Sequence, residues 1–176
     1  MSGLLVGDIS SVAEFLAHAL EMEVESAERY RELADSMEVH NNPEVAASFR
    51  TLAGESDAHV EQVQRLAGST ELPDIAPWAF KWSSPDGPES TRMEDVHYLM
   101  NRRQALKLAL HNEVRGLDFY KEVAARSPTT RVRQLAAEMA GEEEVHVTML
   151  RTLLSKAEDD AASRALPDLD PPNIPG

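Results

Sequence analysis

Apolar residues recur at helical spacing along most of this chain, and the strict alternation that is typical of strands is not seen. In the first helical stretch the positions expected to face inward lie three and four residues apart. They are Phe15, Ala19, Met22, Glu23, Ala27, Tyr30, Leu33, Ala34 and Met37. The pattern predicts an all-α protein, and it places one acidic residue, Glu23, where an apolar side chain is expected.

Local capping signals set the limits of four predicted helices. The first begins at Ser11, where Ser11-x-x-Glu14 forms a capping box, and runs to about residue 38. Asn42 followed by Pro43 opens a second helix, which ends near Gly68. The third helix is expected over about residues 101–126 and the fourth over about residues 128–162. The connections between these helices are therefore short, long and short.

The long connection covers about residues 69–100 and is rich in Pro, Ser and Gly. Thr91-x-x-Glu94 within it predicts the start of a short helix. Such a link predicts an up-down-down-up four-helix bundle, crossed along its length by the connection. Residues 1–162 would form one bundle domain, and residues 163–176 a Pro-rich tail that cannot continue the helix. That tail is expected to be a frayed end or a surface strap, with docking of a partner or a second subunit as the alternative.

Composition narrows the classes of protein to consider. The chain has 176 residues, of which 42% are hydrophobic and 27% charged, as expected for one soluble globular domain. It has no cysteine, which excludes disulfides, thiolate metal sites and a cysteine nucleophile. Its net charge of −14 argues against binding to nucleic acid or to an anionic membrane. The N-terminus does not resemble a signal peptide and no apolar run is long enough to span a membrane, so we predict a cytoplasmic protein.

The two halves of the chain repeat one pattern. ALEMEVESAERYRELA aligns with LALHNEVRGLDFYKEVA, so that Glu23 and Tyr30 match Glu113 and Tyr120, 90 positions later. LAGESDAHVEQV aligns with MAGEEEVHVTML, with an offset of 87 positions between matched residues. Two helical hairpins built on one pattern are expected to pack around a pseudo-two-fold axis, which brings matched residues together at the centre.

Helical angles predict which of the repeated side chains point inward. At about 100° per residue, Glu143 falls near the centre of the apolar seam of the fourth helix, with His146 beside it. That seam consists of Val132, Leu135, Met139, Leu150 and Leu153. The seam of the second helix is centred on Ser56, with His59 at its flank. With the matched glutamates of the first and third helices, three carboxylates and two imidazoles point into one interior.

Buried carboxylates must be protonated, paired or bound to a cation, and these seams contain no Lys or Arg. A divalent metal is the simplest compensation, and carboxylates with imidazoles from facing helices suit iron or manganese. A single Glu-x-x-His is a weak signal, whereas the repeated constellation is stronger. Acidic residues beside the seams are interpreted as solvated charges: Glu21, Glu25, Glu142 and Glu144. Histidines without a matched partner are assigned no role: His18, His40, His97 and His111.

These residues resemble the rubrerythrin branch of the ferritin-like superfamily over about residues 10–158. That family has a Glu seven residues before a Tyr on the first and third helices, and Glu-x-x-His on the second and fourth. The matches are Glu23 with Tyr30, Glu113 with Tyr120, Glu143 with His146, and His59 without its glutamate. LPDIAPWAFKW resembles the crossover of such proteins. The two tyrosines are interpreted as packing residues that could also donate a hydrogen bond to a ligand carboxylate.

The resemblance implies a ferritin-like four-helix bundle that binds two iron ions, or one here, with manganese or zinc as alternatives. The implied metal ligands are Glu23, His59, Glu113, Glu143 and His146, with Glu55 as an additional candidate. It also implies chemistry on peroxide, oxygen or ferrous iron, and a homodimer. Because the chain lacks the cysteines of a rubredoxin-type module, a peroxidase would need an external electron donor.

Ser56 is the main departure from the family, since a glutamate that bridges both metals is expected there. Glu55, about 40° around the helix from His59, is the first candidate to replace it, and Asp57 is less favoured. The loss of a bridging carboxylate is expected to weaken one metal position more than the other. Two hypotheses follow: a diiron oxidoreductase, or a non-enzymatic bundle with a degenerate or mononuclear site that serves binding or assembly.

Overall fold

The computed structural model describes residues 8–82 and 101–165. In this part of the chain the elements are α1 (Val12–Val39), α2 (Pro43–Ala67), the short 3₁₀ helix η2 (Pro77–Ala79), α3 (Arg102–Arg126) and α4 (Thr130–Ala165), without a strand. The predicted all-α, four-helix fold is confirmed. No helix within the described ranges is both long enough and apolar enough to cross a membrane.

The helix limits follow the capping signals closely. The Ser11 hydroxyl accepts a hydrogen bond from the backbone N–H of Glu14 at 3.0 Å, and Asn101 forms a complete capping box at the start of α3. Asn42 differs from expectation, because its side chain donates to the His40 carbonyl instead of capping α2. Helix α4 continues to Ala165, beyond the expected end at residue 162. The helix start predicted at residues 91–94 and the tail from residue 166 lie outside the described residues.

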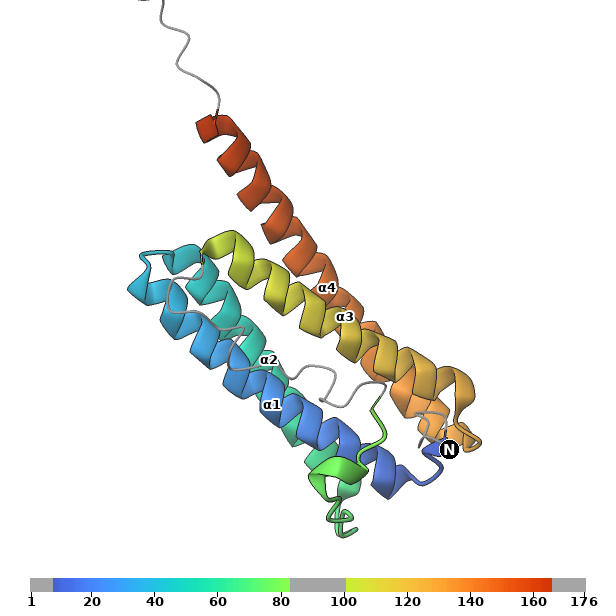
Figure 1. Ribbon diagram of the computed structural model, residues 1–176. Coiled ribbons are helices and arrows are strands. Elements are labelled where there is room, and N and C mark those ends of the chain that lie inside the picture. The colour runs from blue at the N-terminus through green and yellow to red at the C-terminus, as the bar shows by residue number, and fades with distance from the viewer. Residues whose placement is uncertain (1–7, 83–100, 166–176) are drawn as a thin grey trace, which may run out of the picture.

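The four helices pack as two hairpins, α1 with α2 and α3 with α4, which lie against each other in the bundle (Figure 1). The C-terminal part of α4 extends beyond the ends of the other helices (Figure 1). Because each hairpin contributes one Glu-Tyr helix and one His helix, this arrangement brings the repeated residues face to face.

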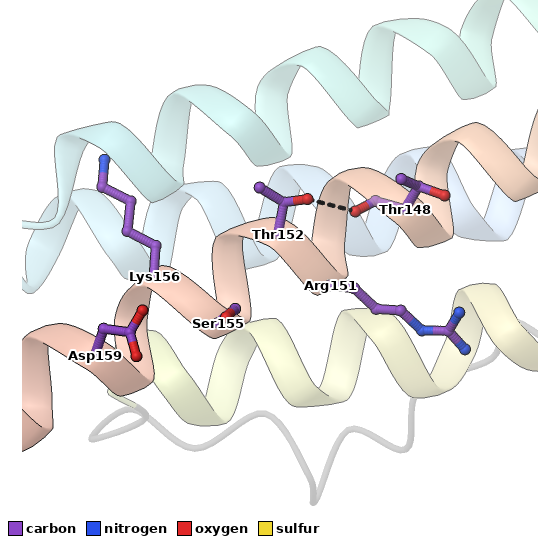
Figure 2. A pocket seen from close by; sticks show the side chains of 6 residues that line it. All are labelled: Thr148, Arg151, Thr152, Ser155, Lys156 and Asp159. Carbon is purple, nitrogen blue, oxygen red and sulfur yellow. Dashed lines mark hydrogen bonds between the residues drawn. The ribbon is translucent and has the colours of Figure 1, made fainter.

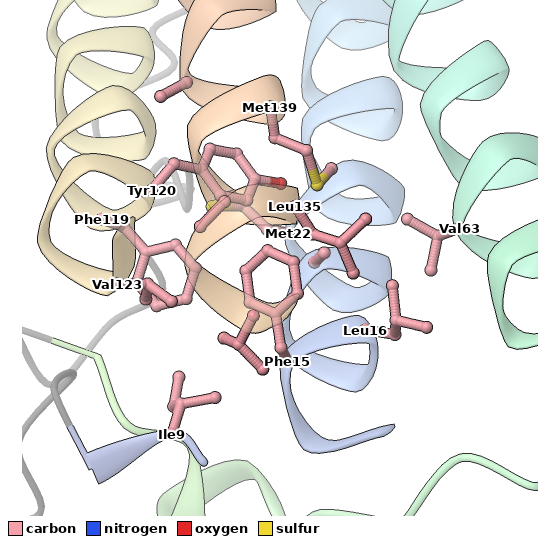
Figure 3. Packing of buried hydrophobic residues seen from close by; sticks show 14 of the residues in the cluster. Ile9, Phe15, Leu16, Met22, Val63, Phe119, Tyr120, Val123, Leu135 and Met139 are labelled. Atoms are coloured by element: carbon pink, nitrogen blue, oxygen red, sulfur yellow. The ribbon is translucent and has the colours of Figure 1, made fainter. Parts of the chain in front are cut away.

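Two apolar clusters fill the interior, one toward each end of the bundle. The first includes Phe15, Met22, Val63, Phe119, Tyr120 and Met139 (Figure 3). The second includes Tyr30, Phe49, Leu52, Leu106 and Leu150. Between these clusters the inward positions of all four helices carry polar side chains, so the centre of the bundle is a polar layer with apolar packing on both sides.

His18, to which the sequence pattern assigns no role, forms a hydrogen bond that binds the segment after η2 to α1. Its Nε2 accepts a hydrogen bond from the backbone N–H of Lys81 at 2.9 Å, and its Nδ1 lies 2.8 Å from the Glu14 carbonyl. Because Nε2 accepts, the ring is neutral and Nδ1 donates. The ring lies edge-on to Trp82 and is stacked with Phe119. Burial lowers the pKa of His18, which agrees with this neutral form.

Candidate metal centre

The polar layer contains the residues that the sequence predicted to meet. Glu23 from α1, Glu113 from α3 and Glu143 from α4 are each no more than 2% exposed. His146 from α4 is buried, and the side chain of His59 from α2 is 12% exposed. Four helices therefore place three carboxylates and two imidazoles in one interior, as the helical angles indicated.

The ligand atoms of these residues form two triads that share one carboxylate. Glu23, His59 and Glu143 make the first triad, and Glu113, His146 and Glu143 make the second. Within each triad the candidate ligand atoms all lie within 4.8 Å of one another. One carboxylate common to two neighbouring groups of donors is the arrangement in which a glutamate can bridge two metal ions.

Both histidines direct Nδ1 toward the shared carboxylate. His59 Nδ1 lies 3.3 Å from an oxygen of Glu23 and 3.8 Å from an oxygen of Glu143. His146 Nδ1 lies 3.5 Å from an oxygen of Glu113 and 3.3 Å from the other oxygen of Glu143. The two imidazole rings are stacked, with centroids 5.7 Å apart. The pseudo-two-fold relation expected from the repeat is thus present in the side-chain geometry.

Two tyrosines donate hydrogen bonds to Glu23 and Glu113, the carboxylates that belong to one triad each, and each bond joins the two hairpins. The Tyr30 hydroxyl of α1 donates to Glu113 of α3, and the Tyr120 hydroxyl of α3 donates to Glu23 of α1 at 3.1 Å. These hydrogen bonds restrict the rotamers of both carboxylates and link the two hairpins across the centre. The expectation that the tyrosines could donate hydrogen bonds to these carboxylates is confirmed.

The outer edges of the imidazoles face two further carboxylates. His146 Nε2 lies 2.7 Å from Glu55 of α2, and His59 Nε2 lies 3.2 Å from Glu142 of α4. Sequence reasoning treated Glu142 as a solvated charge and considered Glu55 for the His59 side of the centre. The 87-residue repeat, which matches Glu55 with Glu142, was the signal that could have identified both.

Ionisation in the metal-free chain follows from these contacts. Burial lowers the pKa of His59, but the carboxylates of Glu23 and Glu142 outweigh burial and hold that pKa above its ordinary value. Burial also lowers the pKa of His146, and Glu113 reverses the effect in the same way. Burial raises the pKa of Glu113, but the nearby His146 imidazole, Glu143 and the Tyr30 hydroxyl together lower it by more, so the pKa of this carboxyl lies below its ordinary value. The raised pKa values favour the protonated imidazoles, which would offset part of the buried negative charge, and a bound metal ion would compete with those protons.

The donor set fits a divalent metal. His59 Nδ1 and Glu113 Oε2 are buried without a hydrogen-bond partner, and both belong to the triads. Unsatisfied buried polar atoms are costly, and a cation placed among them would satisfy both. Three carboxylates with two imidazoles on facing helices suit iron, manganese or zinc.

A hollow of about 290 Å³ opens onto the centre between α2 and α4. Glu55, Ala58, His59, Glu142, Val145 and His146 line it. A larger hollow, of about 620 Å³, lies further along α4 among the side chains from Thr148 to Asp159 (Figure 2). No residue that lines the larger hollow belongs to either triad. Of these two hollows, the smaller is the one whose lining includes members of the triads, His59 and His146.

Ser56 occupies the place of the matched glutamate and is buried, 3% exposed. The sequence led us to expect that its presence weakens one metal position more than the other. Each triad has one glutamate and one histidine of its own and shares Glu143. The expectation that serine at position 56 weakens one metal position more than the other stays a prediction.

Comparison with known proteins agrees with this geometry. The Rubrerythrin family profile matches residues 14–77. The chain is also similar to an uncharacterized conserved protein from Magnetospirillum magnetotacticum MS-1, whose crystal structure is known at 2.00 Å resolution. The identity is 42% and the TM-score 0.71, over 83% of this chain and 95% of the other. No curated protein matches this chain.

Proposed function

This chain belongs to the rubrerythrin family of ferritin-like proteins, and from that premise we propose that it binds two iron ions and acts as an oxidoreductase on peroxide, oxygen or ferrous iron. The proposed ligands are Glu23, His59, Glu113, Glu143 and His146. The observation that carries the proposal is the pair of buried triads that share Glu143.

Each part of the site has a role in this proposal. Bound iron would supply the redox chemistry. The Nδ1 atoms of the two histidines face the interior, and the tyrosine hydroxyls keep the terminal carboxylates in place. The apolar clusters limit access of water from both ends of the bundle, and the hollow between α2 and α4 leaves room for a small oxidant. Since the chain contains no cysteine, electrons for peroxide reduction would come from a separate donor.

Ser56 supports a second candidate function. With five protein ligands in place of six, the centre could hold metal without turning over an oxidant, and the bundle would then serve binding or assembly. Zinc or manganese would suit that role as well as iron. The two candidates differ in redox activity and agree on metal binding.

The test is metal analysis followed by turnover. Purified protein is loaded with ferrous iron without oxygen, desalted and analysed, and then mixed with peroxide or with oxygen. Two irons per chain together with consumption of either oxidant is the expected result. Bound metal with no consumption of either oxidant would favour the second candidate, and no bound metal would refute both.

A homodimer and a cytoplasmic location also stay proposals. Light scattering coupled to size-exclusion chromatography is expected to give twice the 19.5 kDa mass of one chain, and a mass of one chain would refute the dimer.

A further inference from the structure

We propose that Glu55 and Glu142 are positioning residues, each of which orients the metal-binding histidine of the opposite helix. An oxygen of Glu55 of α2 lies 2.7 Å from Nε2 of His146 of α4, and an oxygen of Glu142 of α4, which has no other hydrogen-bond partner among the described residues, lies 3.2 Å from Nε2 of His59 of α2. The inference rests on the proposed metal binding, and it assigns Glu55 a role other than that of a ligand.

The two nitrogens of each imidazole face different surroundings. Nδ1 points toward the interior carboxylates, at 3.3 Å from Glu23 for His59 and from Glu143 for His146. Nε2 points outward to Glu142 or to Glu55, at 3.2 Å and 2.7 Å. A carboxylate that accepts the Nε2 proton fixes the tautomer, leaves the Nδ1 lone pair free for a metal and makes the ring a stronger donor.

The contact occurs twice, at matched places in the repeat. Glu55 lies four residues before His59 on its own helix, yet its contact at 2.7 Å is with His146. Glu142 lies four residues before His146 and its contact at 3.2 Å is with His59. Both contacts therefore cross from α2 to α4, as the pseudo-two-fold relation between the hairpins requires.

Neighbouring acids on the same turns behave differently. Asp57 pairs with Arg31, and Glu144 pairs with Lys121 at 2.8 Å. The ion pairs of Glu55 and Glu142 within the described ranges are with histidines alone. Side-chain exposures of 46% and 43% place these two carboxylates at the rim of the hollow, outside both groups of ligand atoms.

Because position 56 has a serine instead of a glutamate, the orientation of His59 and His146 by Glu142 and Glu55 matters more for metal binding. Each triad contains three donors, one of which is shared, so a misoriented imidazole would remove a third of the protein ligands from its triad. A carboxylate that holds the ring from outside prevents that loss without occupying a coordination position.

The first experiment titrates Co²⁺ into Glu55→Gln, Glu142→Gln and the matched control Glu144→Gln, by calorimetry and by the visible absorption of the bound ion. Glutamine keeps the side-chain size and removes the charge. We expect Glu55→Gln and Glu142→Gln to bind about tenfold or more weakly than the wild type, and Glu144→Gln to bind within about twofold of it. Circular dichroism and the metal-free unfolding temperature show whether each variant is folded.

A second experiment tests the crossing itself, in His59→Ala and His146→Ala backgrounds. With His59 removed, Glu55→Gln should still weaken Co²⁺ binding and Glu142→Gln should have no further effect; with His146 removed, the roles should exchange. The reverse coupling would make Glu55 a ligand on the His59 side and overturn the inference. Equal binding by the wild type and both glutamine variants would overturn it while leaving metal binding intact, whereas a wild-type chain that binds no Co²⁺ would refute the proposed function as well.

Discussion

Substitution of Glu143 by glutamine should remove both metal positions at once. Glu143 is the one residue common to the two triads, whereas Glu23 and Glu113 each belong to one. Glutamine preserves the volume of the side chain but loses the charge and one of the two oxygens that would face separate ions. Glu143→Gln should therefore be far more damaging to metal binding than Glu23→Gln, although the two glutamates are equally buried.

The size of the effect follows from linkage between binding and unfolding. A metal present at 100 times its dissociation constant stabilises the folded state by about 2.7 kcal/mol per site. For a chain of this length, 1 kcal/mol raises the unfolding temperature by about 2–4 °C. Two occupied sites should raise it by about 10–20 °C in the wild type. We expect about half of that rise in Glu23→Gln and almost none in Glu143→Gln.

Differential scanning calorimetry with and without Zn²⁺ measures this rise. The rise caused by the metal is the relevant quantity, because each substitution also removes a buried partner of a histidine and changes the metal-free unfolding temperature. Glu144→Gln, which alters a surface pair with Lys121, should keep the full rise. A Glu143→Gln variant that keeps half of the wild-type rise would show that Glu143 serves one metal alone, and the shared-ligand interpretation would be wrong.

Two further predictions concern Ser56 and His18. Ser56→Glu should tighten Co²⁺ binding about tenfold or more, because affinity for a hard cation rises with the number of carboxylates. Its metal-free form should be less stable than the wild type, and calorimetric titration that finds Ser56→Glu no tighter than Ser56→Ala would contradict the prediction. Because burial lowers the pKa of His18 below its ordinary value of 6.5, the stability that the neutral ring contributes is present above that value and is lost as the pH falls through the folded-state pKa. The wild type should therefore lose stability relative to His18→Phe between about pH 7 and 5, measured by urea unfolding of both metal-free proteins; parallel pH profiles would refute the neutral-ring interpretation.

Much of the fold could be predicted because helix limits depend on nearby residues. The hydroxyl of Ser11 and the side chain of Asn101 cap helices through contacts three residues away, and such contacts can be recognised in the sequence. The inward positions of α1 were equally accessible, since they follow from the helical period alone. Every residue predicted to face inward on α1 is buried.

The meeting of the candidate ligands could also be predicted, because the two halves repeat. Residues that match across a pseudo-two-fold axis must lie at equal distances from it, so Glu23 and Glu113 were expected on opposite sides of one centre. What the repeat could not indicate was that Glu143 faces both triads. That depends on how closely α4 approaches α1 and α3, which the seam of a single helix does not specify.

The sequence by itself determined the all-α class, the helix limits and the inward direction of the three central glutamates, because each depends on neighbours along one helix. Only the tertiary structure decided the partners of Glu55, Glu142 and His18. Glu55 lies one turn from His59 but contacts His146 of the opposite helix, and His18 accepts a hydrogen bond from a backbone N–H 63 residues away. A charged side chain at the edge of a seam can face solvent or a neighbouring helix, and the packing angle and distance between helices decide which of the two occurs.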